Sequence, residues 1–300
     1  MAQPCRAEQD QWPRHNAEIA ERLISSDGAR LCTEPFGDPA DPPVLLVMGL
    51  GASMLWWPAG FCDLLADRGV FVIRYDHRDT GRSTTYEHGH PGYTGADLLA
   101  DAVAVLDGYD LSAAHLVGVS AGGALVQLLA LDVPSRVRSL TLISTSPALP
   151  GGRSLPAPTA AFMEFVRSTS VDWSDTDSAV DYLVAYSRVL AGEERHFDES
   201  EARGLIRRDA ERAHDFAALQ NHDLIEHDDR PRGPLASIEA PALVIHGTAD
   251  PMFPLAHGQA LADAIPGARL LALEGAGHGV ERADWETTAR AIAELAASVG

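Results

Sequence analysis

The sequence predicts an α/β domain with a mostly parallel, doubly wound sheet, into which a helical segment is inserted. From residue 43 onward, short and almost continuously apolar runs alternate with longer segments of helical periodicity. Strands of a parallel sheet that is covered on both faces lack polar alternation, so such runs are expected there. Regular alternation of strands and helices is typical of a doubly wound fold. The interval 148–235 interrupts this alternation, which indicates the insertion.

Six runs are expected to be strands because they are short, apolar and rich in β-branched residues. They cover residues 44–49, 70–76, 114–120, 139–145, 241–247 and 269–275. Helices are expected between them, at residues 61–69, 96–110, 121–132 and 256–267. A last helix is expected near the end of the sequence, where one face carries Trp285, Ile292, Leu295 and Ala296.

The interval 148–235 is expected to form a helical cap. It opens with the Pro- and Gly-rich stretch PALPGGRSLPAPTA and closes with DDRPRGPLASIEAP, and the segment between them has helical patterns but no convincing strand. The chain is therefore divided into an N-terminal extension at 1–25, a core at 26–147 and 236–300, and the cap between the two parts of the core. The extension is compatible with a separate amphipathic helix.

The composition argues against several kinds of partner. The 300 residues include 43 acidic and 23 basic side chains, a formal net charge of −20. Such a surface repels phosphate backbones and anionic lipid headgroups, so neither nucleic acid nor membrane is expected as a partner. The three cysteines have irregular spacing, and no stretch of the sequence resembles a signal peptide, a membrane span, a metal motif or a nucleotide-binding loop. We therefore expect a cytoplasmic location, no metal and no cofactor, and leave the oligomeric state open.

A pentapeptide at the end of the third expected strand predicts a nucleophile. Gly118-Val119-Ser120-Ala121-Gly122 lies where this strand gives way to a helix. A sharp turn at such a junction exposes the serine, and the flanking glycines let the strand and the helix approach closely. The free N–H groups at the start of the helix also point toward the reaction site. Ser120 is therefore the expected nucleophile.

A serine nucleophile needs a base, and the base needs an acid that orients it. Asp250 follows the fifth expected strand and His278 follows the sixth. The carboxyl ends of parallel strands meet at one edge of the sheet, so both residues are expected to lie near Ser120. We expect His278 to accept the serine proton while Asp250 holds the other ring N–H. Activity should then be lost at acid pH, where a protonated imidazole accepts no proton.

The other polar candidates have structural or solvent-exposed interpretations. His115 and His246 fall within expected strands. The histidines of the cap are expected to be solvated, namely His196, His214, His222 and His227. Asp76 and Arg78, which follow the second expected strand, are expected to form a buried ion pair with each other.

A glycine-rich loop follows the first expected strand and suggests an oxyanion hole. The backbone N–H groups of Leu50, in this loop, and of Ala121, at the elbow, are the expected donors to the oxyanion. Apolar residues near these loops are candidates for a substrate pocket, namely Met54, Trp56, Trp57, Met252 and Phe253.

Taken together, these motifs resemble the α/β-hydrolase superfamily over residues 26–300. The strings LLVMGLGASMLWW, VIRYDHRDTGRSTT, VGVSAGG and LVIHGTADPMFP, followed by GAGH, are most similar to the actinobacterial aclacinomycin methylesterase group, including MG in place of the usual HG. The resemblance implies an α/β-hydrolase fold and a carboxylic ester hydrolase whose substrate is a bulky, apolar small molecule such as a polyketide methyl ester. It implies the same roles for Ser120, Asp250, His278, Leu50 and Ala121.

Other reactions use the same three residues and stay open at this point. They include hydrolysis of a C–C bond, opening of a lactone and cofactor-free perhydrolysis, because fold and triad do not separate these chemistries. A protein that only binds a ligand is a further alternative, although a binding protein has no need of all three residues.

Overall fold

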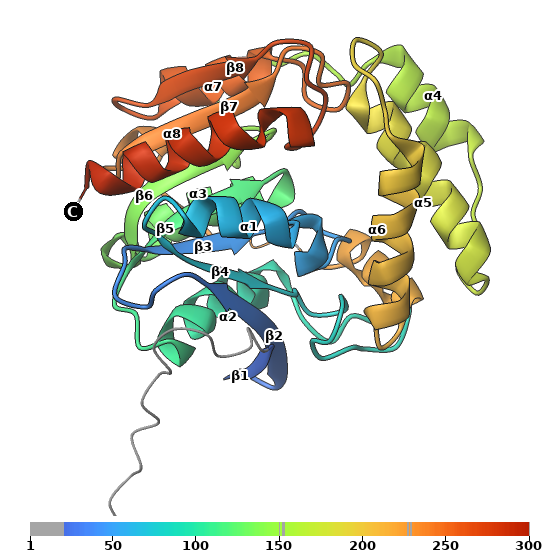
Figure 1. Cartoon of the computed structure of the whole chain (residues 1–300), viewed down its shortest axis with the longest axis horizontal. Helices are drawn as coiled ribbons and strands as arrows, with labels where there is room; N and C mark the ends of the chain where they lie inside the picture. Colours follow the sequence, from blue (N-terminus) through green and yellow to red (C-terminus); the bar gives the residue numbers. More distant parts are fainter. Residues whose placement is uncertain (1–20, 150, 152–153, 227, 229, 300) are drawn as a thin grey trace, which may run out of the picture.

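The computed structural model describes residues 21–149, 151, 154–226, 228 and 230–299. At its centre lies a sheet of eight strands in the order β1-β2-β4-β3-β5-β6-β7-β8 (Figure 1). The pairs from β4 through β3 to β8 are parallel. The pairs β1–β2 and β2–β4, at one edge, are antiparallel. The doubly wound, mostly parallel sheet predicted from the sequence is thereby confirmed.

Each predicted strand and core helix has a counterpart in the structure. The strands are β3 (Pro43–Val47), β4 (Phe71–Tyr75), β5 (Ala114–Val119), β6 (Val137–Ile143), β7 (Ala242–Gly247) and β8 (Arg269–Leu273). The helices are α1 (Ala59–Ala66), α2 (Gly95–Gly108), α3 (Ala121–Asp132), α7 (Ala256–Ala264) and α8 (Trp285–Ala297).

The two antiparallel strands were not expected from the sequence. β1 (Arg22–Ser26) and β2 (Ala29–Phe36) form a hairpin whose turn contains Gly28 at a φ of 70°. The sheet therefore begins at Arg22, before residue 26, where the sequence placed the start of the core. Ile24 explains why, since its buried side chain packs against α2 where Gly108 leaves room. The amphipathic helix considered for the extension lies largely outside the described residues.

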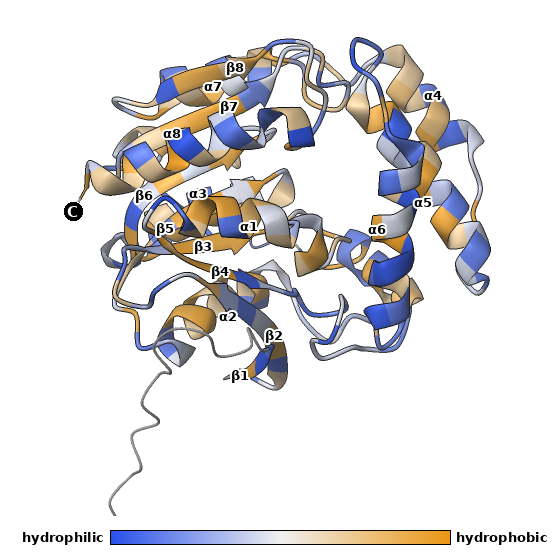
Figure 2. Ribbon diagram, in the orientation of Figure 1, coloured by the Kyte–Doolittle hydropathy of each residue, from blue (hydrophilic) through white to orange (hydrophobic). Residues whose placement is uncertain are grey.

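Helices cover both faces of the sheet, and each face has its own apolar core. Alternate residues of a strand point to opposite faces. Leu45 and Val47 of β3 pack with α2, α3 and α7, whereas Val44 and Leu46 pack with α1 and α8. Figure 2 shows the resulting hydrophobic strands in the middle of the molecule. This burial on both faces is the reason for the continuous apolar runs in the sequence.

The interval between β6 and β7 is helical in its described residues. It contains α4 (Ala160–Ser168), α5 (Thr176–Ala191), α6 (Glu199–Arg212) and the 3₁₀ helix η3 (Phe216–Asp223). Helices α4, α5 and α6 stand together on one side of the sheet (Figure 1). Val180 and Val184 of α5 pack against Ile206 of α6 in a small core of their own. We keep the name cap for residues 148–235, and its bounds as a domain remain a prediction.

A buried ion pair joins the loop after β4 to helix α2. Arg78 donates two hydrogen bonds of 2.8 Å to the carboxylate of Asp101, and both side chains are almost fully buried. Ser26 Oγ donates a further bond of 2.6 Å to the same carboxylate. The expected pairing of Arg78 with Asp76 is therefore wrong, because Asp76 is paired with Arg212 of the cap.

This geometry generates a stability prediction. Asp101→Ala should destabilise the chain by about 3–5 kcal/mol, because it leaves the guanidinium of Arg78 buried without its counterion. Urea unfolding followed by circular dichroism measures this change. Asp107→Ala, on the same helix, removes an exposed partner of Arg136 and should cost less than about 1 kcal/mol. Equal losses in the two variants would show that the buried pair contributes no more than a surface pair.

Candidate active site

Ser120 occupies a strained turn between β5 and α3. Its φ of 54° and ψ of −122° lie outside the regions that ordinary residues favour. A Cβ at Gly118 would overlap the backbone of Gly122, and a Cβ at Gly122 would overlap the end of β3. The carbonyl of Ser120 accepts a hydrogen bond of 2.7 Å from Thr145 Oγ1. The two glycines are therefore needed because strand and helix come into direct backbone contact.

Asp250 and His278 are hydrogen-bonded to each other. The distance from Asp250 Oδ2 to His278 Nδ1 is 2.9 Å, and Asp250 is only 3% exposed. The other carboxylate oxygen, Oδ1, accepts bonds of 2.9 and 2.8 Å from the N–H groups of Met252 and Phe253. A carboxylate at Nδ1 requires a proton there, so Nε2 of the neutral ring is the nitrogen that can accept a proton.

The loop that carries His278 is fixed from two sides. The N–H of His278 donates a bond of 2.8 Å to the carbonyl of Leu190, at the C-terminal end of α5. The N–H of Gly279 donates a bond of 3.0 Å to Ser144 Oγ, at the end of β6. The role of Ser144 in holding the histidine loop depends on a contact that has no signature in the sequence.

The loop at residues 48–54, which we call the oxyanion loop, passes directly beside Ser120. A Cβ built at Gly49 would lie 3.3 Å from the Cβ of Ser120. Within the described part of the chain, no hydrogen bond is formed by the N–H of Leu50 or that of Ala121. The first N–H groups of a helix have no partner inside the helix, so the amide of Ala121 is open to a ligand.

His222 lies against this loop, which corrects the expectation that it is solvated. It is 4% exposed, its Nδ1 accepts a bond of 2.6 Å from the N–H of Gly51, and its Nε2–H donates one of 2.8 Å to the carbonyl of Arg78. Burial, together with the nearby His77, lowers the pKa of His222 to about 3. The ring is thus neutral, with its proton on Nε2. Gly51 and His222 are 171 residues apart in sequence, and no motif connects them.

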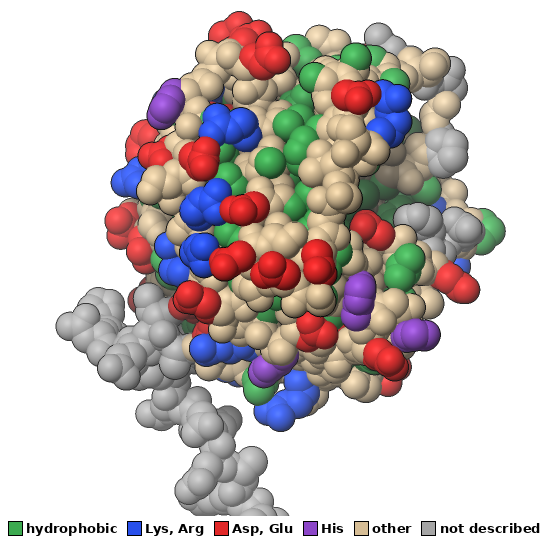
Figure 3. All heavy atoms as spheres, turned by 90° about the vertical axis from the view of Figure 1, so that its right-hand side faces the viewer, with side chains coloured by type: hydrophobic (Ala, Val, Ile, Leu, Met, Phe, Trp, Pro, Cys, Tyr) green, Lys and Arg blue, Asp and Glu red, His purple; other side chains and the backbone are tan. Residues whose placement is uncertain are grey.

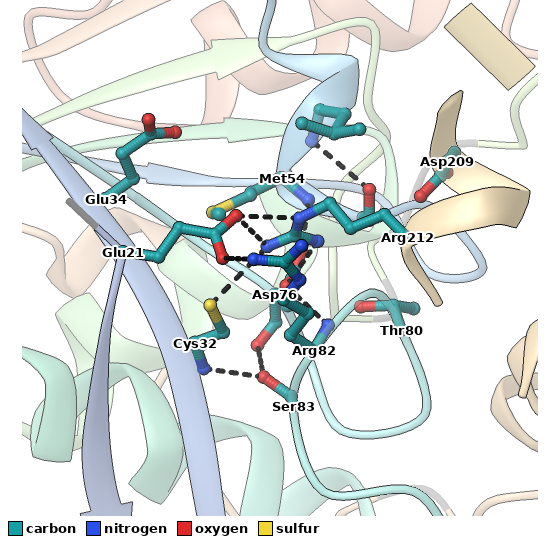
Figure 4. Close-up of polar contacts among 12 residues, drawn as sticks. Glu21, Cys32, Glu34, Met54, Asp76, Thr80, Arg82, Ser83, Asp209 and Arg212 are labelled. Atoms are coloured by element: carbon teal, nitrogen blue, oxygen red, sulfur yellow. Dashed lines mark hydrogen bonds and ion pairs between the residues drawn. The ribbon is translucent and has the colours of Figure 1, made fainter. Parts of the chain in front are cut away.

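A buried carboxylate connects the oxyanion loop to cap helix α6 (Figure 4). Asp76 Oδ1 accepts a bond of 2.9 Å from the N–H of Met54, and Oδ2 accepts one of 2.9 Å from the N–H of Arg82. Arg212, the last residue of α6, forms an ion pair of 2.7 Å with Asp76 Oδ2. Burial raises the pKa of Asp76 to about 6, and the guanidinium of Arg212 opposes this effect.

The five candidate pocket residues have different environments. Met54 and Trp57 are 0% and 2% exposed, so they belong to the packed interior and have no surface to offer a substrate. Trp56 donates a bond of 2.8 Å from Nε1 to Asp209 Oδ2 of α6 and so joins the segment just after the oxyanion loop to the cap. Met252 and Phe253 are partly exposed, and the Phe253 ring lies 5.7 Å from that of His278.

An aromatic cluster that the sequence analysis did not identify lies in the cap. Ring contacts connect Phe162, Phe165, Trp173, Tyr182, Tyr186 and Phe216. Tyr186 is four residues, or about one helical turn, before Leu190 on α5. The carbonyl of Leu190 accepts a hydrogen bond from the His278 backbone, so the cluster begins about one turn from the loop that carries His278.

The burial of His222 generates a prediction for the pH dependence of stability. The folded chain keeps this ring neutral down to about pH 3, whereas the unfolded chain protonates it near pH 6.5. The stability that the neutral His222 ring contributes is therefore fully present above pH 6.5 and is lost as the pH falls from 6.5 toward about 3. Between about pH 7 and about pH 5, wild type should lose about 2 kcal/mol more than His222→Asn. Urea unfolding at both pH values measures the difference, and parallel pH dependences would contradict a buried neutral ring.

Comparison with known proteins shows the family to which this chain belongs. The sequence profile of the alpha/beta hydrolase fold family matches residues 42–280. The rhodomycin D methylesterase DauP of Streptomyces sp. (strain C5) is 38% identical over 286 residues, which is 90% of this chain and 96% of that protein. The rhodomycin D methylesterase DnrP of Streptomyces peucetius is 37% identical, with the same coverage.

Solved structures share the fold at lower identity. A meta-cleavage product hydrolase from Pseudomonas fluorescens IP01 superposes with a TM-score of 0.71 at 19% identity, over 95% of this chain and 100% of that chain. An enol-lactonase from Burkholderia xenovorans LB400 superposes with a TM-score of 0.64 at 24% identity, over 91% and 99%. The chain therefore belongs to the α/β-hydrolase fold family and, within it, to the aclacinomycin methylesterase group.

Proposed function

We propose that this protein is a serine esterase that hydrolyses the methyl ester of a bulky, apolar polyketide-type molecule. The observation that carries the proposal is the 2.9 Å bond between Asp250 and His278 at the sheet edge where the strained turn presents Ser120. The relatives DauP and DnrP are named as methylesterases, which supports a methyl ester as the bond that is cleaved.

In the proposed reaction, Ser120 Oγ attacks the ester carbonyl while His278 Nε2 takes its proton. The tetrahedral intermediate expels methanol, which receives that proton, and leaves an acyl group on Ser120. Water then repeats the two steps and releases the acid. Asp250 keeps His278 in the correct tautomer and stabilises the imidazolium that forms in each step.

The proposed oxyanion hole consists of the N–H groups of Leu50 and Ala121. Both are without a hydrogen bond in the described structure, so no internal partner competes with the developing oxyanion. Donors that are already in place stabilise charge in the transition state without reorganisation, which typically contributes about 10²–10³ in rate for each donor.

The apolar surroundings support a bulky, uncharged acyl group. Phe253 lies beside His278, and the aromatic cluster of α4 and α5 begins about one turn from the same edge. The formal charge of −20 disfavours anionic substrates and favours departure of the acid product.

The proposal also covers the molecular partners of this protein and its location in the cell. The partner is a small-molecule ester, without nucleic acid or membrane, and the location is the cytoplasm. Cys32 and Cys62, the cysteines within the described residues, are buried free thiols, which agrees with a reducing compartment. None of the described helices is long and apolar enough to cross a membrane.

The first test removes the proposed nucleophile. Ser120→Ala should lower kcat on p-nitrophenyl esters by about 10⁶, because the acyl-enzyme cannot form. A chromogenic assay with acetate to octanoate esters measures turnover and pocket size together. Ser168→Ala, on the exposed surface of α4, is the matched control and should keep full activity. Undiminished turnover by purified Ser120→Ala would disprove the assignment of the nucleophile.

A second test concerns the bond that is cleaved. Purified protein should release methanol from the methyl ester of a polycyclic aromatic acid faster than it cleaves a matched 1,3-diketone or opens a matched lactone. Liquid chromatography of acid, ketone and hydroxy-acid products compares kcat/KM for the three substrates. Preference for the diketone or the lactone would replace the esterase proposal by C–C hydrolysis or lactone hydrolysis with the same triad.

A further inference from the structure

Several hydrogen bonds from groups outside the triad hold the oxyanion loop in place, among them the following three. His77 Nε2–H donates a bond of 2.9 Å to the carbonyl of Met48, and the N–H of Gly51 donates one of 2.6 Å to His222 Nδ1. The third bond runs from the N–H of Met54 to Asp76. The first two attach to the backbone on either side of Leu50, whose amide is the proposed oxyanion donor.

The contact at Gly51 is polar rather than steric. Gly51 has a φ of 75°, and a Cβ at this position would meet nothing nearer than Leu219 Cδ1 at 3.8 Å. A side chain at this position would therefore meet no tight steric contact. The bond to His222 gives the Gly51 peptide a directional partner, because its acceptor is a single lone pair on a buried ring.

The second hydrogen bond of His222 makes the first one possible. Its Nε2–H donates to the carbonyl of Arg78, so the proton resides on Nε2 and Nδ1 is an acceptor. The ring is 4% exposed and lies at 6.0 Å from the ring of His77, nearly perpendicular to it. Burial lowers the pKa of His77 as well, so the two rings next to the loop are neutral.

We infer that His222, contributed by the cap, is a positioning residue of the oxyanion hole that aligns the Leu50 amide by holding the amide of Gly51. The inference rests on the proposed function, since it gives Leu50 a role in the reaction. It assigns to η3 of the cap a part in transition-state stabilisation, whereas a cap is otherwise expected to act on substrate selection.

Loss of the bond between Gly51 and His222 should weaken stabilisation of the transition state and leave binding of the substrate nearly unchanged. Loss of an oxyanion donor costs about 10²–10³ in rate, and a misplacement of about 1 Å can cost about 10². Without the bond from Gly51, kcat should therefore fall by about 10- to 100-fold. KM should stay within about threefold, because a ground-state ester carbonyl gains little from the hole.

Two conservative variants separate the two hydrogen bonds of His222. Asparagine places its amide oxygen near the position of Nδ1 and can accept from Gly51, whereas glutamine places its amide near Nε2 and can donate to Arg78. We expect kcat to fall in His222→Gln. The kcat of His222→Asn should be at least about tenfold higher than that of His222→Gln. His115→Gln is the matched control, because His115 is buried in β5 and its hydrogen bond among the described residues goes to Ser139 of β6 rather than to the loop.

The experiment measures kcat and KM on a p-nitrophenyl ester, the inhibition constant of an aryl trifluoromethyl ketone, and Tm. The ketone adduct carries an oxyanion, so its inhibition constant should rise in His222→Gln by the factor by which kcat falls. The inference is overturned if His222→Gln keeps the kcat of wild type. It is also overturned if asparagine and glutamine lose activity equally, or if the losses follow Tm alone and appear in His115→Gln too.

Failure of the proposed function has a different signature. If Ser120→Ala retains turnover in the same assay, the esterase proposal fails irrespective of His222. If Ser120→Ala is inactive and wild type is active, the kinetics of the His222 variants report on the positioning role alone.

Discussion

The close contact of helix α3 with strands β3 and β5 determines where Ser120 and the oxyanion loop lie. Gly118 and Gly122 allow the backbones to touch, and any side chain at either position would separate them. The same contact forces Ser120 into its strained conformation and brings Gly49 of the oxyanion loop against it. The energy of this strain is offset by two apolar cores that cover the sheet on both faces.

The cap contributes contacts that hold the loops of the candidate active site. Its helix α5 holds the histidine loop through the Leu190 carbonyl, η3 holds the oxyanion loop through His222, and α6 reaches Asp76 through Arg212. Each contact is directional and mostly buried, so it fixes the position of the group that it holds in addition to packing against it. Under the proposed function, changes in the cap are therefore expected to alter the rate of the reaction.

Much of the fold was predictable because its signals are local. The runs that became β3 to β8 are apolar on both faces, and the helices between them repeat at helical spacing, so the pattern itself specifies a covered parallel sheet. The hairpin of β1 and β2 was missed because these strands lie toward one edge of the sheet and mix polar with apolar residues. Their strand character comes from pairing with β4 and from the packing of Ile24 on α2, which are both non-local.

The sequence by itself determined the order of the elements, the elbow motif around Ser120 and the placement of Asp250 and His278 after successive strands. These features follow from short-range periodicity and from the rule that parallel strands end at one edge. Only the tertiary structure decided that Arg78 pairs with Asp101, that Trp57 and Met54 belong to the core, and that His222 is buried on the oxyanion loop. Burial and directional hydrogen bonds depend on residues far apart in the chain, and no local pattern encodes which of them meet.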